Sequence, residues 1–227
     1  MEGILAAMLL ASASISFLLA ITNTTVAATT FTLSSIPFLT AIMAWLFLGE
    51  RIGKSTILTI CIAAGGISLM FVQGFGSGTL YGNFMALLCA IGFSSYAIII
   101  RRNRRLEMLP TLILSNLIMM LVALVFTWNN LLISWNDLLI CFILGGLLSA
   151  TVNTLFLIAA KQLFLIAAKH LFAAELTLFM LLEFTLGPIW VWIFVNEVPT
   201  SWTLVGGSIV ISAVLLKSVS ELHNWSF

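Results

Sequence analysis

The chain has 227 residues, of which 62% are hydrophobic and only 7% are charged, and its net charge is +1. Soluble domains carry about 25% charged residues. This composition, with a mean hydropathy of +1.20, therefore excludes a water-soluble globular protein and indicates a polytopic membrane protein. The net charge gives no indication of a nucleic-acid partner.

Eight apolar segments are long enough to cross a bilayer, which takes about 20 residues. In chain order, we expect spanning helices at residues 3–21, 26–48, 55–72, 80–100, 109–128, 137–161 or beyond, 173–197 and 202–216. The glycine-rich stretch Gly74–Gly78 predicts a turn after the third helix. The predicted fold class is an all-α membrane protein with an eight-helix transmembrane bundle.

The basic residues segregate to one face of this predicted bundle. They lie in the second, fourth and sixth connections and after the last helix, namely Arg51, Lys54, Arg101, Arg102, Arg104, Arg105, Lys161, Lys169 and Lys217. Because cytoplasmic loops are enriched in Lys and Arg, we expect this face and both termini to be cytoplasmic, in a multi-pass protein of the cell (inner) membrane. We interpret the cluster at 101–105 as a topological anchor rather than an anion site.

Two parts of the chain repeat. Residues 45–50 (WLFLGE) recur 147 positions later as residues 192–197 (WIFVNE), with Trp, Phe and Glu aligned. Residues 17–20 recur 139 positions later as 156–159, and the difference of eight is the length of a tandem duplication within 155–170. Because equivalent segments are five helices apart, they cross the membrane in opposite directions. This pattern predicts an inverted-topology repeat, as in many secondary transporters.

The repeat divides the chain unequally. Residues 1–73 hold three helices, residues 80–219 hold five, and residues 220–227 form a cytoplasmic tail. Since a complete pair has five helices in each half, we expect the first two helices of the first repeat to be missing. An extra eight residues within the bilayer would bury Lys161, so we expect Lys161 at the cytoplasmic boundary and the second copy outside the bilayer.

Several segments resemble a known family. Residues 24–52, which include SSIPFLTAIMAWLFLGE, and residues 63–71 (AAGGISLMF) resemble the fourth and fifth helices of EamA-type members of the drug/metabolite transporter superfamily. Residues 82–102 and 171–211 resemble a complete second EamA unit. The resemblance implies a ten-helix bundle of two inverted units, here with an incomplete first repeat, that moves small molecules by alternating access. It places the cavity between the helices predicted at 3–21, 26–48, 80–100, 137–161 and 173–197.

Glu183 is the first candidate for a functional residue. It lies near the middle of the predicted helix 173–197, where a charged side chain costs about 2.5–3.5 kcal/mol on insertion scales. Such a carboxyl could couple transport to protons or hold a substrate amine, or it could be a protonated group bonded to a neighbouring helix. Pro188, one turn later, frees a backbone carbonyl that a nearby group must satisfy.

Other polar residues are secondary candidates. Tyr96, Asn153 and Thr154 either contact substrate or form interhelical hydrogen bonds. Glu50 and Glu197 end equivalent helices on opposite faces, where they act as caps or gates.

Small residues and prolines mark places where the predicted helices break or approach closely. Ser34, Ser35 and Pro37 predict a local break in the helix at 26–48 and a place in the cavity. Three glycine pairs, at 65–66, 145–146 and 206–207, predict close helix packing.

The leading hypothesis is a secondary transporter that exports a small metabolite or drug-like compound. The alternative is a truncated or degenerate membrane protein without transport activity of its own. The sequence holds no constellation typical of an enzyme, and its three cysteines lie singly, at spacings that fit no metal site. We expect no cofactor and no metal; the expected partners are the lipid bilayer and a small-molecule substrate, while protons and a second copy of the chain remain open.

Overall fold

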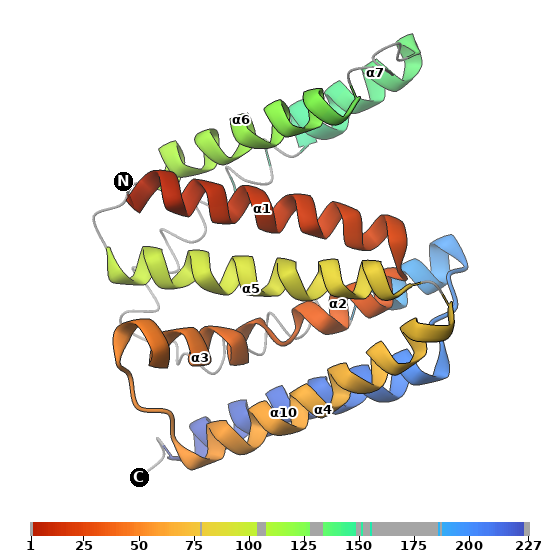
Figure 1. Ribbon diagram of the computed structural model, residues 1–227. Helices are drawn as coiled ribbons and strands as arrows, with labels where there is room; N and C mark the ends of the chain where they lie inside the picture. Colours follow the sequence, from red (N-terminus) through yellow and green to blue (C-terminus); the bar gives the residue numbers. More distant parts are fainter. Residues whose placement is uncertain are drawn as a thin grey trace.

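The computed structural model describes residues 2–77, 79–103, 108–127, 134–148, 151, 155, 186 and 188–224. Within this part of the chain, all regular structure is helical, and the helices form a bundle (Figure 1). The elements are α1 (Glu2–Asn23), α2 (Val26–Leu33), α3 (Ile36–Leu48), α4 (Lys54–Ser77), α5 (Leu80–Arg102), α6 (Met108–Thr127), α7 (Trp135–Cys141), the π-helix η2 (Phe142–Leu148) and α10 (Ser201–Asn224). Residues 188–195 are also helical.

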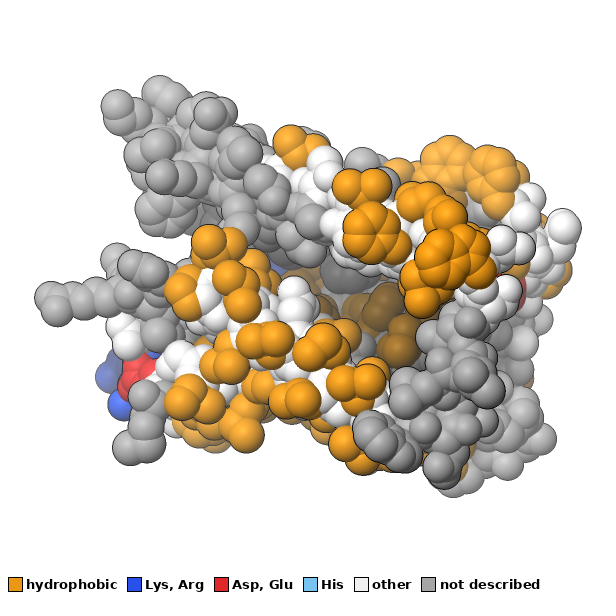
Figure 2. Space-filling model, turned by 90° about the horizontal axis from the view of Figure 1, so that it is seen from above, with side chains coloured by type: hydrophobic (Ala, Val, Ile, Leu, Met, Phe, Trp, Pro, Cys, Tyr) orange, Lys and Arg blue, Asp and Glu red, His pale blue; other side chains and the backbone are white. Residues whose placement is uncertain are grey.

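Five stretches of the described chain are long and apolar enough to cross a membrane. They are Glu2–Asn23, Val26–Leu48, Lys54–Phe71, Leu80–Arg102 and Leu109–Phe126. Much of the surface is hydrophobic, and Figure 2 shows apolar side chains spread over the face in view. Lipid is the environment in which such a surface is stable. The prediction of an all-α membrane bundle is confirmed.

The helices pack through small residues. In α1, Ala6, Ala7 and Ala13 are fully buried, and α1 packs along α5. A Cβ placed on Gly92 of α5 would lie 2.9 Å from the Cβ of Ala13, so the two helices are already in close contact there. In lipid, where helices gain little from the hydrophobic effect, close backbone approach supplies the packing energy.

Helices α4 and α10 cross at a pair of glycines. A Cβ on Gly66 would lie 2.6 Å from the carbonyl oxygen of Gly206, and a Cβ on Gly206 would lie 2.5 Å from the carbonyl oxygen of Gly66. Gly207 faces the ring of Phe31 in α2 with similar closeness. Gly66, Gly206 and Gly207 therefore allow close packing as predicted, whereas a Cβ on Gly65 would meet no described atom within 4 Å. For the pair at 145–146, a Cβ on Gly145 meets no described atom within 4 Å.

The helix expected at 26–48 is broken in its middle. Helix α2 ends at Leu33, α3 begins at Ile36, and Pro37 occupies the first turn of α3. Proline has no N–H to donate and disfavours helical geometry in the residue before it. The hydroxyls of Ser34 and Ser35 donate to the carbonyls of Phe31 and Thr32, both at 2.6 Å, so the break leaves the two serines satisfied. The predicted break is thus present.

Three elements differ from the sequence-based expectation. Helix α4 continues through Gly74 to Ser77, where a turn was expected. Glycine costs a helix only about 1 kcal/mol relative to alanine, so it does not by itself end one that is already formed. Helix α10 runs to Asn224, beyond the predicted end at residue 216. Residues 142–148, expected within a regular helix, form the π-helix η2.

The described basic residues lie at one end of the bundle, which we call the basic end: Arg51, Lys54, Arg101, Arg102 and Lys217. Helices α3, α5 and α10 finish toward this end and α4 begins there (Figure 1). The start of α1 lies there too, because the Asn103 amide donates to the Glu2 carboxylate at 2.8 Å. Which side of the membrane this end faces stays a prediction.

Two helices of opposite direction end in the same local geometry. At the basic end, α3 stops at Gly49, whose φ is 68°, and Glu50 follows. At the other end, residues 188–195 stop at Asn196, whose φ is 57°, and Glu197 follows. Asparagine is among the few residues besides glycine that adopt this left-handed conformation readily. Two segments related by the 147-residue shift thus share one type of helix end.

Candidate functional site

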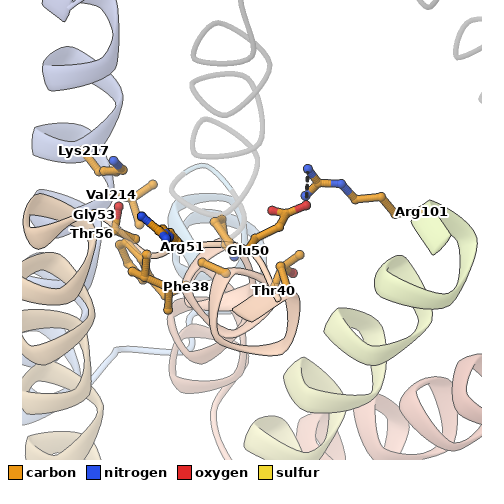
Figure 3. Close-up of a pocket in the computed structure, with 13 residues that line it drawn as sticks. Phe38, Thr40, Glu50, Arg51, Gly53, Thr56, Arg101, Val214 and Lys217 are labelled. Atoms are coloured by element: carbon orange, nitrogen blue, oxygen red, sulfur yellow. Dashed lines mark ion pairs between the residues drawn. The ribbon is translucent and has the colours of Figure 1, made fainter. Parts of the chain in front are cut away.

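A cavity of about 290 Å³ lies at the basic end (Figure 3). It is formed by α3, the α3–α4 connection, the start of α4, the end of α5 and the end of α10. Its apolar wall comes mainly from α3, where Ala41 and Ala44 leave room beside Phe38. Pro37 lies on the same wall, so the broken helix contributes its second half to the cavity.

Among the described residues, four charged side chains line this cavity. They are Glu50, Arg51, Arg101 and Lys217. An Arg101 nitrogen lies 2.9 Å from a Glu50 carboxylate oxygen, and this ion pair joins α5 to the connection after α3. Both side chains are about half exposed, and such pairs contribute about 0.2–1 kcal/mol. The pair is therefore easy to break and re-form, unlike a buried one.

Figure 3 places the other two cations away from this ion pair. Arg101 faces Glu50 from the α5 side, whereas Arg51 and Lys217 lie toward α4 and α10, close to Thr56 and Val214. Within the described residues, the charged groups of the lining are three cations and one carboxylate. The side chain of Lys217 is half-buried, and that of Arg51 is exposed.

At the other end of the bundle, Glu197 bonds to the start of α2. Its carboxylate accepts the backbone N–H of Val26 at 2.7 Å. Thr25 is the N-cap residue, and its hydroxyl accepts the N–H of Ala28 at 3.1 Å. The first N–H groups of a helix have no partner within the helix, and its positive N-terminal dipole favours an anion. Glu197 thus fastens the segment before α10 to α2.

A second polar contact joins three elements at that end. The Thr24 hydroxyl donates to the Asn83 side-chain oxygen at 2.7 Å, and the Asn83 amide donates to the Met70 carbonyl at 3.4 Å. Asn83 is 4% exposed. Next to it, Gly82 lies against the α1–α2 turn so closely that a Cβ there would come within 2.6 Å of the backbone of Asn23 and Thr24. The described elements are therefore tightly joined at this end, while the cavity lies at the other.

The predicted site residues fall into two groups. Glu183, Asn153 and Thr154 lie outside the described residues, as does nearly all of the duplication at 155–170. The other predicted site residues are described. Among them, Pro188 is helical and buried, and only Pro37 and Glu50 line the cavity.

The remaining described candidates lie away from the cavity. Ser34 and Ser35 are buried and bonded to their own helix. Tyr96 is half-buried on α5. On the same helix, Ser94 donates to the Ile36 carbonyl at 3.3 Å, beside the break between α2 and α3.

Residues 3–72 match the EamA-like transporter family, and this match spans α1 to α3 and most of α4. This part of the chain is similar to the EamA type. The EamA-type segment contains the broken helix, the ion-paired Glu50 and much of the cavity wall. The match agrees with the resemblance of residues 24–52 and 63–71, and it covers less than half of the chain. No curated protein and no solved structure matches the chain.

The sequence did not single out Arg51 and Lys217, and it assigned Arg101 to topology alone. These residues are far apart in the chain, and each is an ordinary boundary charge when taken alone. The only local signal is that all of them belong to the basic face that the charge pattern defines. Their convergence on one cavity depends on how α3, α4, α5 and α10 pack.

Proposed function

We propose that the protein is a secondary transporter in which two inverted repeats alternate access to a site between them. The observation that carries the proposal is the pair of equivalent helix ends. Two helices that run in opposite directions each end at a residue with left-handed backbone conformation, Gly49 or Asn196. A glutamate, Glu50 or Glu197, follows each of these residues. Together with the EamA match over residues 3–72, this supports an inverted arrangement of the kind that alternating access uses.

Three further features support the same proposal. The helix of α2 and α3 is discontinuous, which is typical of transporter helices at a substrate site. The described elements are bonded together at the end that holds Glu197, whereas a cavity lies at the basic end. The α4–α10 crossing is also reciprocal, since Gly66 and Gly206 each face the other's carbonyl. Reciprocal contacts of this kind are expected on a two-fold axis.

The proposed direction is export, with the basic end facing the cytoplasm. A small metabolite or drug-like compound would enter the cavity from that end. The proposed coupling residue is Glu183, because a carboxylate at mid-membrane is costly unless it binds a proton, a cation or a substrate amine.

Efflux from cells tests the proposal. Cells that produce the protein are loaded with a panel of amino acids, small metabolites and cationic dyes, and efflux is followed at two external pH values. We expect faster efflux of at least one compound, and Glu183→Gln to abolish efflux or its pH dependence. Glu175→Gln serves as the matched control, because Glu175 is the third residue of the predicted helix 173–197 and is expected near the membrane boundary, whereas Glu183 is expected near the centre.

Two outcomes would contradict the proposal in different ways. Unchanged efflux and pH dependence in Glu183→Gln would remove Glu183 from the mechanism. A chain that reaches the membrane at normal abundance yet moves no compound of the panel would favour a membrane protein without transport activity of its own.

The proposed orientation is testable separately. We expect a fluorescent reporter that folds only in the cytoplasm to be active on both termini, because Glu2 and Lys217 both lie at the basic end. An export-dependent enzyme reporter should be inactive at both positions. Reporters that place the two termini on different sides of the membrane would contradict the inverted arrangement.

A further inference from the structure

We propose that α6 is a dimer interface, through which a second copy of this chain pairs its Asn116 with Asn116 in the middle of the membrane. The proposal starts from one polar side chain. Asn116 lies close to the middle of the spanning stretch Leu109–Phe126, and it is exposed on the surface of the bundle. Within the described part of the chain, its side chain makes no hydrogen bond. An amide without a partner therefore faces hydrocarbon.

An amide at this depth has no other source of hydrogen bonds. The hydrocarbon core is about 30 Å thick, so its centre is about 15 Å from either surface, beyond the reach of an asparagine side chain. Transfer of an amide to an apolar medium without a hydrogen bond is strongly unfavourable. The exposed hydroxyls of Ser12 and Ser68 avoid this cost by donating to carbonyls of their own helices. Asn116 needs a partner from outside the bundle.

The surface around Asn116 has the spacing of a packed helix pair. Buried Thr111 and Ser115 lie on one face of α6, which packs beside α1 on the side away from α5 (Figure 1). An offset of two residues turns a helix by about 200°, so the opposite face holds an exposed stripe at intervals of four and three, namely Leu109, Ile113, Asn116, Met120 and Ala123. These intervals are those of the a and d positions in a left-handed helix pair. The stripe points away from the bundle and can meet another helix.

A second copy of this chain supplies the matching helix. A carboxamide both donates and accepts, so two asparagines can satisfy each other through reciprocal hydrogen bonds. Two copies inserted the same way are related by a two-fold axis along the membrane normal, which places a residue near the axis opposite its own equivalent at the same depth. A single asparagine at such a position fixes the register and the number of helices in a helix pair. The stripe is thus complementary to itself.

Association of the full-length chain in phosphatidylcholine vesicles tests the proposal. Förster transfer between copies labelled with donor or acceptor at the C-terminus is measured against the protein-to-lipid ratio. We expect Asn116→Leu to raise the ratio at half-maximal transfer about fivefold or more, as loss of an interhelical hydrogen bond in a membrane does in model peptides. Asn116→Gln keeps the carboxamide and should retain association. Because Asn116→Leu makes a lipid-facing residue apolar, it should fold normally, which circular dichroism checks.

Cysteine cross-linking locates the interface independently of Asn116. In a background without the three native cysteines, Met120→Cys places a thiol on the stripe one turn from Asn116. Leu121→Cys is the matched control, because the two side chains are similarly exposed, at 52% and 59%, but are turned apart by about 100°. With copper phenanthroline as the oxidant, we expect Met120→Cys to form a cross-linked dimer several times faster than Leu121→Cys. Adding Asn116→Leu should slow the cross-linking of Met120→Cys.

Four results would overturn the proposal. The wild-type chain could show no transfer above that of randomly distributed monomers. The Asn116→Leu variant could associate as well as the wild type, so that the amide contributes nothing. Met120→Cys and Leu121→Cys could cross-link at the same rate, which indicates collision rather than a defined interface. In cell membranes, Met120→Cys could cross-link only to a protein of another mass, which assigns the face to a different partner. Among the described residues, none of α6 lines the cavity at the basic end, so each failure leaves the transport proposal standing.

Discussion

Gly66→Ala is expected to destabilise the bundle by about 1–3 kcal/mol, the usual cost of overpacking a close contact. The new Cβ would lie 2.6 Å from the carbonyl oxygen of Gly206 and 2.9 Å from a methyl of Val210. The nearest atom belongs to backbone, so α4 and α10 must separate to admit it. Separation weakens the crossing along its whole length, including the cluster of Phe38, Ala63 and Val210.

Gly65→Ala provides the matched control. Gly65 is the adjacent residue in the same helix, it is exposed, and its Cβ would meet no described atom within 4 Å. Alanine is favoured over glycine in a helix by about 1 kcal/mol, so this variant should be neutral or slightly more stable. The two substitutions are chemically identical, yet Gly66→Ala is expected to lower the stability of the bundle and Gly65→Ala to leave it unchanged or raise it slightly.

Unfolding of the two variants in mixed micelles, titrated with a denaturing detergent and followed by circular dichroism, measures the difference. Gly206→Ala should repeat the effect of Gly66→Ala, because its Cβ would lie 2.5 Å from the Gly66 carbonyl oxygen. Equal stability of the Gly65→Ala and Gly66→Ala variants would show that α4 and α10 do not cross at these glycines.

The break in the helix at 26–48 was predictable because its cause is local. Pro37 has no N–H and constrains Ile36, while Ser34 and Ser35 satisfy their own hydroxyls on the preceding turn. The start at Val26 and the end at Leu48 are also local, set by the Thr25 cap and the left-handed Gly49. No information from distant parts of the chain was required.

The turn predicted at Gly74–Gly78 does not begin at Gly74, because α4 continues to Ser77. Glycine costs a helix only about 1 kcal/mol relative to alanine. A helix that is already formed can therefore continue through Gly74 and Gly76, and the glycines alone did not determine where α4 ends.

The cavity at the basic end was not predictable from the sequence. Glu50 and Arg101 are on different helices, and their ion pair exists only because the end of α5 lies beside the connection after α3. Lys217 reaches the same cavity from the last helix. Charge segregation predicted that these residues share a face, but not which of them meet. The role of Glu183 remains a prediction, since it lies outside the described residues.

Glu197→Ala is expected to loosen the end of the bundle opposite the basic end. It removes the acceptor of the Val26 N–H, a charge-assisted bond of 2.7 Å at a helix N-terminus. Bonds to charged groups contribute about 1.5–3 kcal/mol, so the open population at that end should rise about tenfold or more. Glu197→Gln should have an intermediate effect, because the amide oxygen still accepts the bond without the charge.

Thiol labelling detects this opening. The reporter is Thr29→Cys in a background without the three native cysteines, since Thr29 is fully buried about one turn from Val26. A membrane-impermeant thiol reagent is added on the side opposite the basic end, and the rate of modification is measured. We expect Glu197→Ala to raise this rate about tenfold, in proportion to the open population.

Glu50→Gln provides a control, because it weakens a contact at the basic end and is not expected to raise the labelling rate of Thr29→Cys. It weakens the Glu50–Arg101 pair at the basic end and leaves the Glu197–Val26 bond in place. If the two ends open alternately, freeing the basic end should leave the labelling of Thr29→Cys unchanged or slow it, because states open at one end are closed at the other. Acceleration by Glu50→Gln equal to that by Glu197→Ala would mean general loosening of the bundle. The two carboxylates would then be structural caps on equivalent helices rather than opposing gates.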